Sequence, residues 1–234
     1  IIGERLGNSL GLLLFAWVLS GILGLTLGVL AGAFRGRWPD RLIRGWCLLI
    51  SSTPAFWLAI LLLLVFSVWL GWFPTGLSVP IGVDADSVTF LERLHHAVLP
   101  ALTLSITGVS SIALHTREKM VDVMESDYVL FARARGESLR SIVLRHGVRN
   151  VALPAITLQF ASVSEIIGGS VLVEQVFSYP GLGQAAVTAG LGSDLPLLLG
   201  ITVITAAIVF GGNLIADLLY GAVDPKIRRG AAKS

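Results

Sequence analysis

The sequence predicts an all-α protein, a polytopic bundle of hydrophobic helices that crosses a lipid bilayer. Of its 234 residues, 54% are hydrophobic and only 14% are charged, and the mean hydropathy is +0.82. A soluble domain of this length cannot bury so much apolar surface, so lipid is the expected solvent. The hydrophobic residues also fall into long stretches, and only helices or closed barrels satisfy their own backbone in hydrocarbon.

Five stretches reach roughly the 20 mainly apolar residues that a spanning helix needs. They run at about residues 9–34, 46–70, 97–116, 151–177 and 197–223, and the third is the shortest. We expect these five transmembrane helices to form one domain over residues 1–234. The segment 117–150, between the third and fourth spans, is far longer than a connection needs to be.

Two sequence features predict how the first two spans are shaped. Gly24, Gly28 and Gly32 recur at every fourth position of the first span, a pattern typical of tight helix packing. Pro54 should kink the second span, because it removes one backbone hydrogen bond that neighbouring hydroxyls can partly replace. The kink is either merely structural or a hinge.

The basic residues predict the orientation. Of the 17 Lys and Arg residues, 15 follow the first, third or fifth span, and only Arg5 and Arg93 do not. Since loops on the cytoplasmic side carry the positive excess, the first loop, the segment 117–150 and the C-terminal tail should be cytoplasmic. Ile1 then lies outside, which predicts one further crossing before it. The net charge of +2 gives no indication of nucleic-acid binding.

The segment 117–150 should itself be folded. Apolar residues recur at helical spacing from Met120 to Tyr128, which predicts a first helix. Gly136 can end that helix in the left-handed conformation, and Ser138 can cap a second one. The segment carries seven bases and five acids, which favours a shaped surface for another protein over a generic lipid-binding patch. We therefore predict a helix-turn-helix hairpin on the cytoplasmic surface.

The hairpin sequence carries a family resemblance. The matching runs are Asp127-Tyr128-Val129-Leu130-Phe131-Ala132-Arg133-Ala134-Arg135-Gly136, then residues 145–150 with Leu153-Pro154, and later residues 168–183, 213–220 and 224–228. They resemble the permeases of binding-protein-dependent ABC importers, in the dipeptide, oligopeptide and nickel branch, whose cytoplasmic "EAA" loop the first run matches. The resemblance covers essentially the whole chain. The sequence departs from the family pattern in three ways. Phe131-Ala132 replaces the usual Glu-Ala, and the spacing from Gly136 to Leu153-Pro154 is longer than in sugar permeases. The family's first span is also absent from this sequence.

The resemblance implies half of a translocation path that works by alternating access, driven by partner ATPases. The implied ATPase-coupling residues are Asp127, Tyr128, Ala132, Arg133, Ala134, Arg135 and Gly136. The implied partners are a second, homologous permease, two cytoplasmic ATP-binding subunits and an extracytoplasmic solute-binding protein, in the bacterial inner membrane. The small side chains of the hairpin either let its backbone sit deep in a cleft of a partner or only let it pack on its own bundle.

The chain carries no energy source that we can identify. A phosphate-binding loop needs Gly-Lys followed by Ser or Thr, and no lysine follows a glycine. We therefore expect no enzyme activity and no cofactor in this chain, with ATP and Mg bound by the partner subunits. No metal site is expected either, because the adjacent His95 and His96 point about 100° apart on a helix. The single Cys47 rules out an internal disulfide and is interpreted as a packing residue.

Polar residues inside the spans are candidates for the translocation path. A carboxylate at the bilayer centre costs about 2.5 to 3.5 kcal/mol on insertion scales, so Glu165 should face water or the bundle interior. It either meets substrate or bonds a neighbouring helix. Ser162, close to Glu165, is a further candidate, as are Asn213 and Asp217, although a structural bond one turn after Asn213 is an alternative for Asp217. Glu174 lies near the outer mouth, where it can reach water.

Two other classes compete with the importer permease. One is a secondary transporter coupled to an ion gradient, with Glu165 and Asp217 as coupling acids; it predicts inverted repeats, which the sequence does not show. The other is a non-transporting membrane scaffold whose hairpin recruits a partner. Dipeptides, oligopeptides, nickel and metal-opine complexes all fit the branch, so the substrate is left open.

Overall fold

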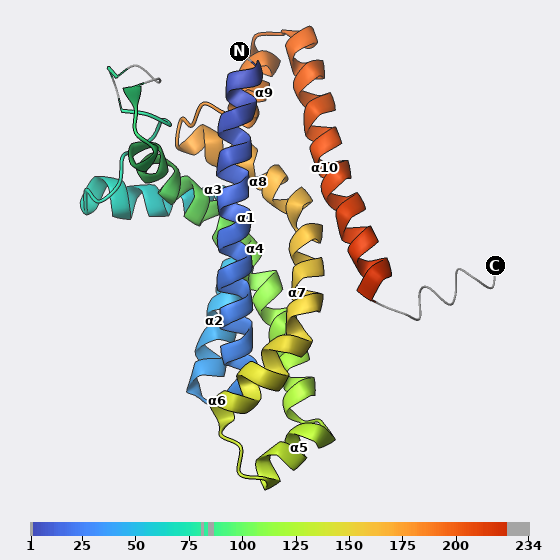
Figure 1. Cartoon of the computed structure of the whole chain (residues 1–234). Coiled ribbons are helices and arrows are strands. Elements are labelled where there is room, and N and C mark those ends of the chain that lie inside the picture. The colour runs from blue at the N-terminus through green and yellow to red at the C-terminus, as the bar shows by residue number, and fades with distance from the viewer. Residues whose placement is uncertain (1, 81, 84–86, 224–234) are drawn as a thin grey trace, which may run out of the picture. The chain divides into compact units, whose positions relative to one another are not determined.

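The computed structural model describes residues 2–80, 82–83 and 87–223. The helices, in chain order, are α1 (Ile2–Ala33), α2 (Trp38–Ser51), α3 (Ala55–Leu62), the π-helix η1 (Leu63–Trp69), α4 (Phe90–Met124), α5 (Asp127–Ala134), α6 (Leu139–Ile142), the π-helix η3 (Val143–Val148), α7 (Arg149–Ala161), α8 (Val163–Val176), α9 (Leu182–Leu191) and α10 (Leu195–Val223) (Figure 1). No strand occurs among the described residues, and the predicted all-α fold class is confirmed.

The chain divides into two compact units, which are described separately. Unit 1 comprises Ile1–Leu19, Thr53–Thr107 and Ser164–Phe210, and unit 2 comprises Ser20–Ser52, Gly108–Val163 and Gly211–Ser234. The long helices α1, α4 and α10 each contribute residues to both units. The tail has four basic residues outside the described residues: Lys226, Arg228, Arg229 and Lys233. The prediction that the tail is cytoplasmic therefore falls on residues that the structure does not describe.

Three helices are long and apolar enough to cross a bilayer by themselves. They are α1, α4 and α10, and two interrupted helix pairs pass the same test when each pair is taken together. By length and composition the described residues therefore offer up to five crossings, the number that the sequence predicts. The limits of the individual spans stay a prediction.

The helix limits differ from the expected spans in three ways. Helix α4 runs from Phe90 to Met124, well beyond residues 97–116 at both ends. Its start is fixed by a capping box, in which Glu92 Oε2 accepts from the backbone nitrogen (2.8 Å) and hydroxyl (2.7 Å) of Thr89. Helix α9 lies in the connection between the fourth and fifth spans, where no helix was expected.

The third difference is that two expected spans are interrupted. The kink predicted at Pro54 is a full break, with Ser52 ending α2 and Pro54 preceding α3. The hydroxyls of Ser51 and Ser52 donate to the carbonyl of Leu48, which also accepts from the backbone nitrogen of Ser52. This is not the carbonyl of Ile50, four residues before Pro54, so the predicted replacement bond is not the one observed. The break at Ser162, between α7 and α8, was not predicted; there the serine hydroxyl donates to the carbonyl of Gln159 (2.8 Å).

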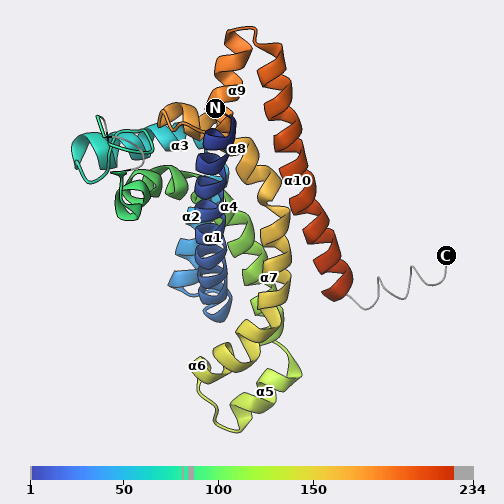
Figure 2. The ribbon, with the colours of Figure 1, turned by 45° about the horizontal axis from the view of Figure 1, so that its top comes forward.

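Unit 1 has two apolar clusters. The larger one contains Leu12, Ala16, Ala59, Leu99, Ala101, Leu104, Ile166, Val173, Phe177 and Tyr179. The smaller one joins α9 to the first part of α10 through Leu182, Ala185 and Ile201, and Figure 2 shows these two helices side by side. The short helix α9 is therefore held by apolar packing within its own unit.

Unit 2 is organised by a close contact between α1 and α4, which lie side by side in both ribbon views (Figures 1 and 2). A Cβ atom added at Gly24 would lie 2.7 Å from Cβ of Ile112, and one at Gly28 would lie 2.5 Å from Cβ of Thr116. A Cβ atom added at Gly32 would likewise lie 2.5 Å from Cβ of Met120. The tight packing predicted from the glycine spacing is confirmed, and α4 is its partner helix.

Candidate functional site

The segment between α4 and α7 folds as the predicted helix-turn-helix hairpin, formed by α5, a tight turn, α6 and η3. The turn is a Schellman motif: Glu137 N donates to Ala132 O (3.1 Å) and Gly136 N donates to Arg133 O (2.9 Å). Gly136 has φ +81°, which is the left-handed region where glycine carries no Cβ penalty. Ser138 caps α6 by accepting from the backbone nitrogen of Ser141 (3.3 Å).

The start of the hairpin differs from the prediction. The apolar periodicity from Met120 to Tyr128 suggested one continuous helix, but α4 ends at Met124 and α5 begins at Asp127. Ser126 has an extended backbone before α5, and its hydroxyl donates to the carbonyl of Val123 (2.5 Å). Ser126 stands at the N-cap position of α5 without a side-chain cap bond, and the periodicity alone did not reveal this break.

One face of α5 packs on unit 2. Val129 and Ala132 are 0% and 2% exposed and belong to an apolar cluster with Met120, Met124 and Ile142. Ala132 therefore fits the interpretation that small residues let the hairpin pack on its own bundle. Figure 1 shows the consequence, with α5 and α6 drawn together below the ends of α4 and α7.

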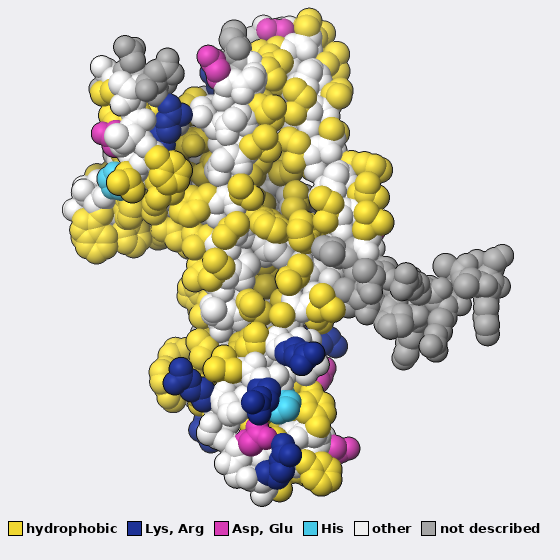
Figure 3. All heavy atoms as spheres, in the orientation of Figure 1, with side chains coloured by type: hydrophobic (Ala, Val, Ile, Leu, Met, Phe, Trp, Pro, Cys, Tyr) yellow, Lys and Arg dark blue, Asp and Glu magenta, His cyan; other side chains and the backbone are white. Residues whose placement is uncertain are grey.

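The opposite face of α5 is open. Leu130 and Phe131 are 66% and 72% exposed, and Tyr128 is also exposed. The other predicted coupling residues Asp127, Arg133, Ala134, Arg135 and Gly136 are exposed as well. Figure 3 shows the resulting mixture of Lys and Arg side chains with hydrophobic ones over the hairpin. Sequence reasoning missed Leu130 and Phe131 as surface residues; helical spacing from the buried Val129 and Ala132 is the signal that finds them.

A polar cluster links the turn to the second half of the hairpin. Arg135 Nη2 donates to Glu137 Oε1 (2.8 Å), and the ring of His146 lies 5.9 Å from that of Tyr128. Glu137 Oε2 and His146 Nε2 lie 3.8 Å apart, and neither atom has a hydrogen-bond partner among the described residues. Asn150 donates to the carbonyl of His146 (2.7 Å), which ties η3 to α7.

A buried ion pair joins the first turn of α2 to the last part of α4. Arg117 donates through Nε to Asp40 Oδ1 (2.5 Å) and through Nη2 to Asp40 Oδ2 (2.8 Å), and Asp40 is 1% exposed. The second oxygen also accepts from the backbone nitrogen of Gly36 (2.8 Å). Two parallel charge-assisted bonds of this kind fix geometry as well as adding energy. The first turn of α2, the preceding turn at Gly36 and the last part of α4 are thus held together.

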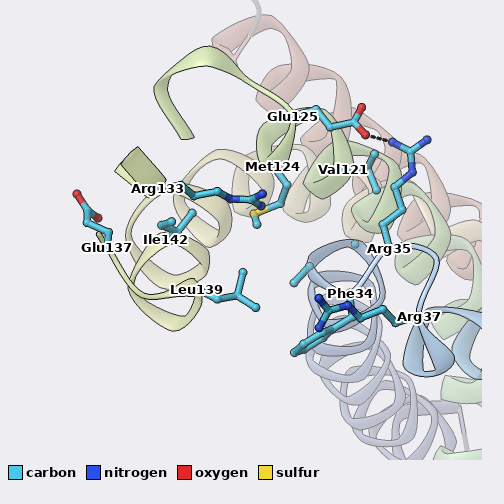
Figure 4. A pocket seen from close by; sticks show the side chains of 12 residues that line it. Phe34, Arg35, Arg37, Val121, Met124, Glu125, Arg133, Glu137, Leu139 and Ile142 are labelled. Atoms are coloured by element: carbon cyan, nitrogen blue, oxygen red, sulfur yellow. Dashed lines mark hydrogen bonds and ion pairs between the residues drawn. The ribbon is translucent and has the colours of Figure 1, made fainter. Parts of the chain in front are cut away.

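A cavity of about 400 Å³ lies between the hairpin, the end of α1 and the end of α4, all in unit 2 (Figure 4). Its apolar lining includes Phe34, Val121, Met124, Leu139 and Ile142. Its charged lining consists of Arg35, Arg37, Glu125, Arg133 and Glu137, of which Arg35 and Glu125 form an ion pair. Sequence reasoning did not predict this cavity, because its walls come from segments about 90 residues apart.

The predicted path residues Ser162 and Glu165 have different surroundings. Ser162 is 7% exposed at the end of α7, in unit 2, and its hydroxyl is used within the helix. Glu165, in the first turn of α8 in unit 1, is exposed and has no partner among the described residues. Glu165 shares its exposed stripe with Gly168 and Leu172, at helical spacing.

Asn213 and Asp217 lie one turn apart on the part of α10 that belongs to unit 2, and both are exposed. Asn213 engages in an interaction with another group. The structure does not bring either residue together with Glu165 within one unit. A common path for all four residues is therefore a matter for proposal.

The expectation for Glu174 is wrong. Instead of reaching water at an outer mouth, this side chain is 0% exposed. Its carboxylate accepts from Ser9 Oγ (2.7 Å) and from the backbone nitrogen of Gln184 (3.0 Å). Glu174 therefore joins α1, α8 and α9 within unit 1. The glycines that follow it in the sequence, Gly181 and Gly183, lie directly against its carboxylate.

The adjacent histidines bond backbone carbonyls. His95 Nε2 and His96 Nδ1 donate to the carbonyls of Trp72 and Gly76, each at 3.0 Å. Both bonds hold the segment that follows η1 against the start of α4. Within the described part of the chain, no group of three His, Cys, Asp or Glu residues is arranged to hold a metal ion.

Apolar helices long enough to cross a bilayer, with a folded hairpin between two of them, are typical of a polytopic membrane protein. A family model described as binding-protein-dependent transport system inner membrane component matches residues 24–229, and the chain belongs to this family. It is a transmembrane permease subunit of an ABC importer in the inner membrane, and ATP hydrolysis takes place in a separate subunit. The resemblance carried by residues 127–136 is confirmed.

Curated relatives match almost the whole chain. The oligopeptide transport system permease protein AppB of Bacillus subtilis is 39% identical over 229 residues, covering 97% of this chain and 71% of the relative. The glutathione transport system permease protein GsiC of Escherichia coli is 38% identical over 227 residues, covering 97% and 70%. The family assignment contradicts both the secondary transporter and the non-transporting scaffold.

A solved structure shares the fold. The MetNI methionine ABC transporter, in an inward-facing conformation, contains a chain that aligns with a TM-score of 0.67 at 15% sequence identity. The alignment covers 94% of this chain and 96% of the other. At that identity the likeness shows the fold alone.

Proposed function

We propose that this chain forms half of a translocation path for small peptides. The observation that carries the proposal is the match to AppB and GsiC, whose names record transport of oligopeptides and of the tripeptide glutathione, over 97% of this chain. These names favour peptides over nickel or metal-opine complexes. Proteoliposomes that contain the complete transporter should accumulate a labelled tripeptide only with ATP and binding protein. Accumulation of nickel without peptide uptake would overturn the proposal.

The proposed assembly has a second, homologous permease, two ATP-binding subunits and an extracytoplasmic solute-binding protein. A family of binding-protein-dependent inner membrane components implies the ATPase and the binding protein in general terms. The second permease is supported by α10, whose window of highest hydropathy is only 6% buried within this chain. Lipid and a neighbouring permease can share such a surface. ATP and Mg belong to the partner subunits, and this chain binds no cofactor.

We place the ATPase contact on the open face of the hairpin, around Tyr128, Leu130, Phe131, Ala134 and Gly136. Exposed aromatic residues with neighbouring arginines are the composition that protein interfaces favour. A cysteine in place of Phe131 should cross-link to the ATPase. A matched cysteine at the buried Val129, on the opposite face of α5, should not cross-link.

The proposed orientation has the hairpin and the C-terminal tail in the cytoplasm, and α9 outside. The lopsided distribution of Lys and Arg supports it, since all the basic residues of the segment 117–150 lie on one side in this arrangement. The orientation brings the hairpin to the side of the membrane where ATP is available.

Glu165 is the residue that we place on the translocation path, with Ser162, Asn213 and Asp217 as neighbouring candidates. An ionised carboxylate without a partner is costly against acyl chains, so a water-filled path is the favourable surrounding for the exposed Glu165. Gly168, four residues before Leu172 on the same stripe, leaves room for a solute beside it. Alternating access then exposes this stripe to each side in turn.

A further inference from the structure

Two arginines of the hairpin cavity form no ion pair among the described residues, and the lining carboxylate Glu137 is bonded to Arg135, outside the lining. Arg37, from the α1–α2 turn, and Arg133, from α5, line the cavity, and neither side chain has a carboxylate partner among the described residues. The third arginine, Arg35, is neutralised by Glu125. Figure 4 shows the two unpaired guanidinium groups directed toward the same space, with Leu139 between them. With three arginines and two glutamates, the lining carries a net positive charge, which favours an anion.

The rest of the lining narrows the chemistry of the anion. Phe34, Val121, Met124 and Ile142 supply an apolar wall beside the guanidinium groups. A small, fully hydrated anion gains no binding free energy from an apolar wall. An anion attached to an apolar chain gains some, because the chain is removed from water when it contacts the wall. Guanidinium groups pair with phosphate oxygens in two parallel hydrogen bonds. The cavity thus fits a phosphate carried by an amphiphile.

The position of the cavity favours lipid as the source of that phosphate. It lies at the end of α1, close to residue 34, where the sequence predicts that the first span leaves the bilayer. Trp38 follows Arg37 directly and is 73% exposed, as is typical of a residue that sits at the level of the headgroups. A basic pocket among helix ends on the cytoplasmic side is the kind of site that binds anionic headgroups.

We propose that this cavity binds the headgroup phosphate of an anionic phospholipid from the adjacent leaflet. Arg37 and Arg133 contact its oxygens, and the apolar wall takes the first carbons of the acyl region. Because Arg37 belongs to the α1–α2 turn and Arg133 to the hairpin, one bound headgroup links the two segments. The bound lipid then holds the hairpin in position relative to the α1–α2 turn. The cavity is a single defined site, unlike a diffuse basic patch.

The test measures lipid binding by the purified, complete transporter. Delipidated transporter is mixed with phosphatidylglycerol or with phosphatidylcholine, and bound lipid is counted by native mass spectrometry. We expect selective retention of phosphatidylglycerol, and Arg37→Gln should weaken it about fivefold, the gain expected for one basic residue near an anionic surface. Arg41→Gln is the matched control, since Arg41 is also exposed on the same turn-and-helix segment but does not line the cavity. It should retain the lipid as the unmodified chain does.

Three results would overturn the proposal. They are equal retention of the two lipids, equal loss in both arginine variants, and displacement of phosphatidylglycerol by millimolar inorganic phosphate, which would identify a free anion as the ligand. The side chain of Arg37 makes no hydrogen bond or ion pair within the described part of the chain, so its variant should fold, and an unchanged thermal transition checks this. Lipid counting does not depend on transport, so a negative result here and a failure of the peptide-transport proposal are distinguishable.

Discussion

The guanidinium of Arg117 and the carboxylate of Asp40 form two parallel hydrogen bonds, at 2.5 and 2.8 Å, in a part of unit 2 where Asp40 is almost fully buried. The sequence separates the two residues by 77 positions. Arg117 lies in α4, seven residues before the end of that helix, so this pair ties the last part of α4 to the start of α2. Removing one partner of a buried pair leaves the other charge without compensation.

The first prediction is that Asp40→Ala destabilises the permease by about 3 to 5 kcal/mol, the range for breaking a buried ion pair. The measurement is the thermal or denaturant stability of the purified permease in detergent. Lys119→Ala is the control, because Lys119 and Asp122 form an exposed pair at 3.6 Å, worth about 0 to 1 kcal/mol. Equal stability losses in the two variants would show that the buried pair contributes no more to stability than the exposed pair.

The second prediction concerns the contact between α1 and α4. A Cβ at Gly28 would lie 2.5 Å from Cβ of Thr116 and 2.6 Å from the carbonyl oxygen of Ala113, so Gly28→Ala must push the helices apart. We expect a stability loss of about 1 to 3 kcal/mol, the usual cost of overpacking. Gly11→Ala, on the same helix but with nothing within 4 Å, should cost nothing. A stable Gly28→Ala variant would contradict the close contact.

The third prediction separates the two glutamates of α8. Glu165→Gln should reduce transport and leave stability within about 0.5 kcal/mol, because Glu165 is exposed and has no partner among the described residues. Glu174→Gln should lower stability by about 1 to 3 kcal/mol, because one carboxylate oxygen that accepts from Ser9 or Gln184 is replaced by a donor. Paired measurements of unfolding and peptide uptake check this. Loss of assembly in Glu165→Gln would assign that residue a structural role.

The fourth prediction concerns orientation. Ala134→Cys on the hairpin should react with a membrane-permeant maleimide but not with an impermeant one in intact cells. Leu191→Cys, at the 85% exposed end of α9, should react with both reagents. The single native Cys47 is buried and contributes little background. Impermeant labelling at Ala134→Cys would overturn the orientation.

The sequence sufficed for those features that depend on local pattern. Hydrophobic length located the helices that can cross a bilayer, and the spacing of Gly24, Gly28 and Gly32 predicted a tight contact. Gly136 and Ser138 were recognised as the turn and the cap of the hairpin because left-handed backbone and helix capping each select few residue types. These signals lie within a few residues of the feature that they predict.

The features that sequence reasoning missed depend on distant residues. The burial of Glu174 follows from Ser9 and Gln184, and the pairing of Asp40 with Arg117 spans 77 positions. The hairpin cavity similarly needs the end of α1 and the hairpin together. The breaks at Ser126 and Ser162 were missed for another reason, since the apolar sequence continues past each serine. In both places the serine hydroxyl donates to a carbonyl of the preceding turn.

We propose that the hairpin couples ATP hydrolysis to transport, with Gly136 as its most sensitive position. At φ +81° a β-branched side chain is strained by about 1 to 3 kcal/mol, although nothing lies within 4 Å of the added Cβ. Gly136→Val should therefore shift the turn between α5 and α6 and leave the long helices intact. Gly136→Asn is the control, because asparagine tolerates the left-handed region.

The most direct measurement is ATP hydrolysis by the reconstituted transporter, with and without peptide-loaded binding protein. The Gly136→Val variant should be present at a normal level, but its stimulation by loaded binding protein should be about tenfold lower, the factor that corresponds to 1.4 kcal/mol. The Gly136→Asn variant should retain most of the stimulation. Full stimulation and normal peptide uptake in Gly136→Val would contradict the coupling role assigned to residues 127–136.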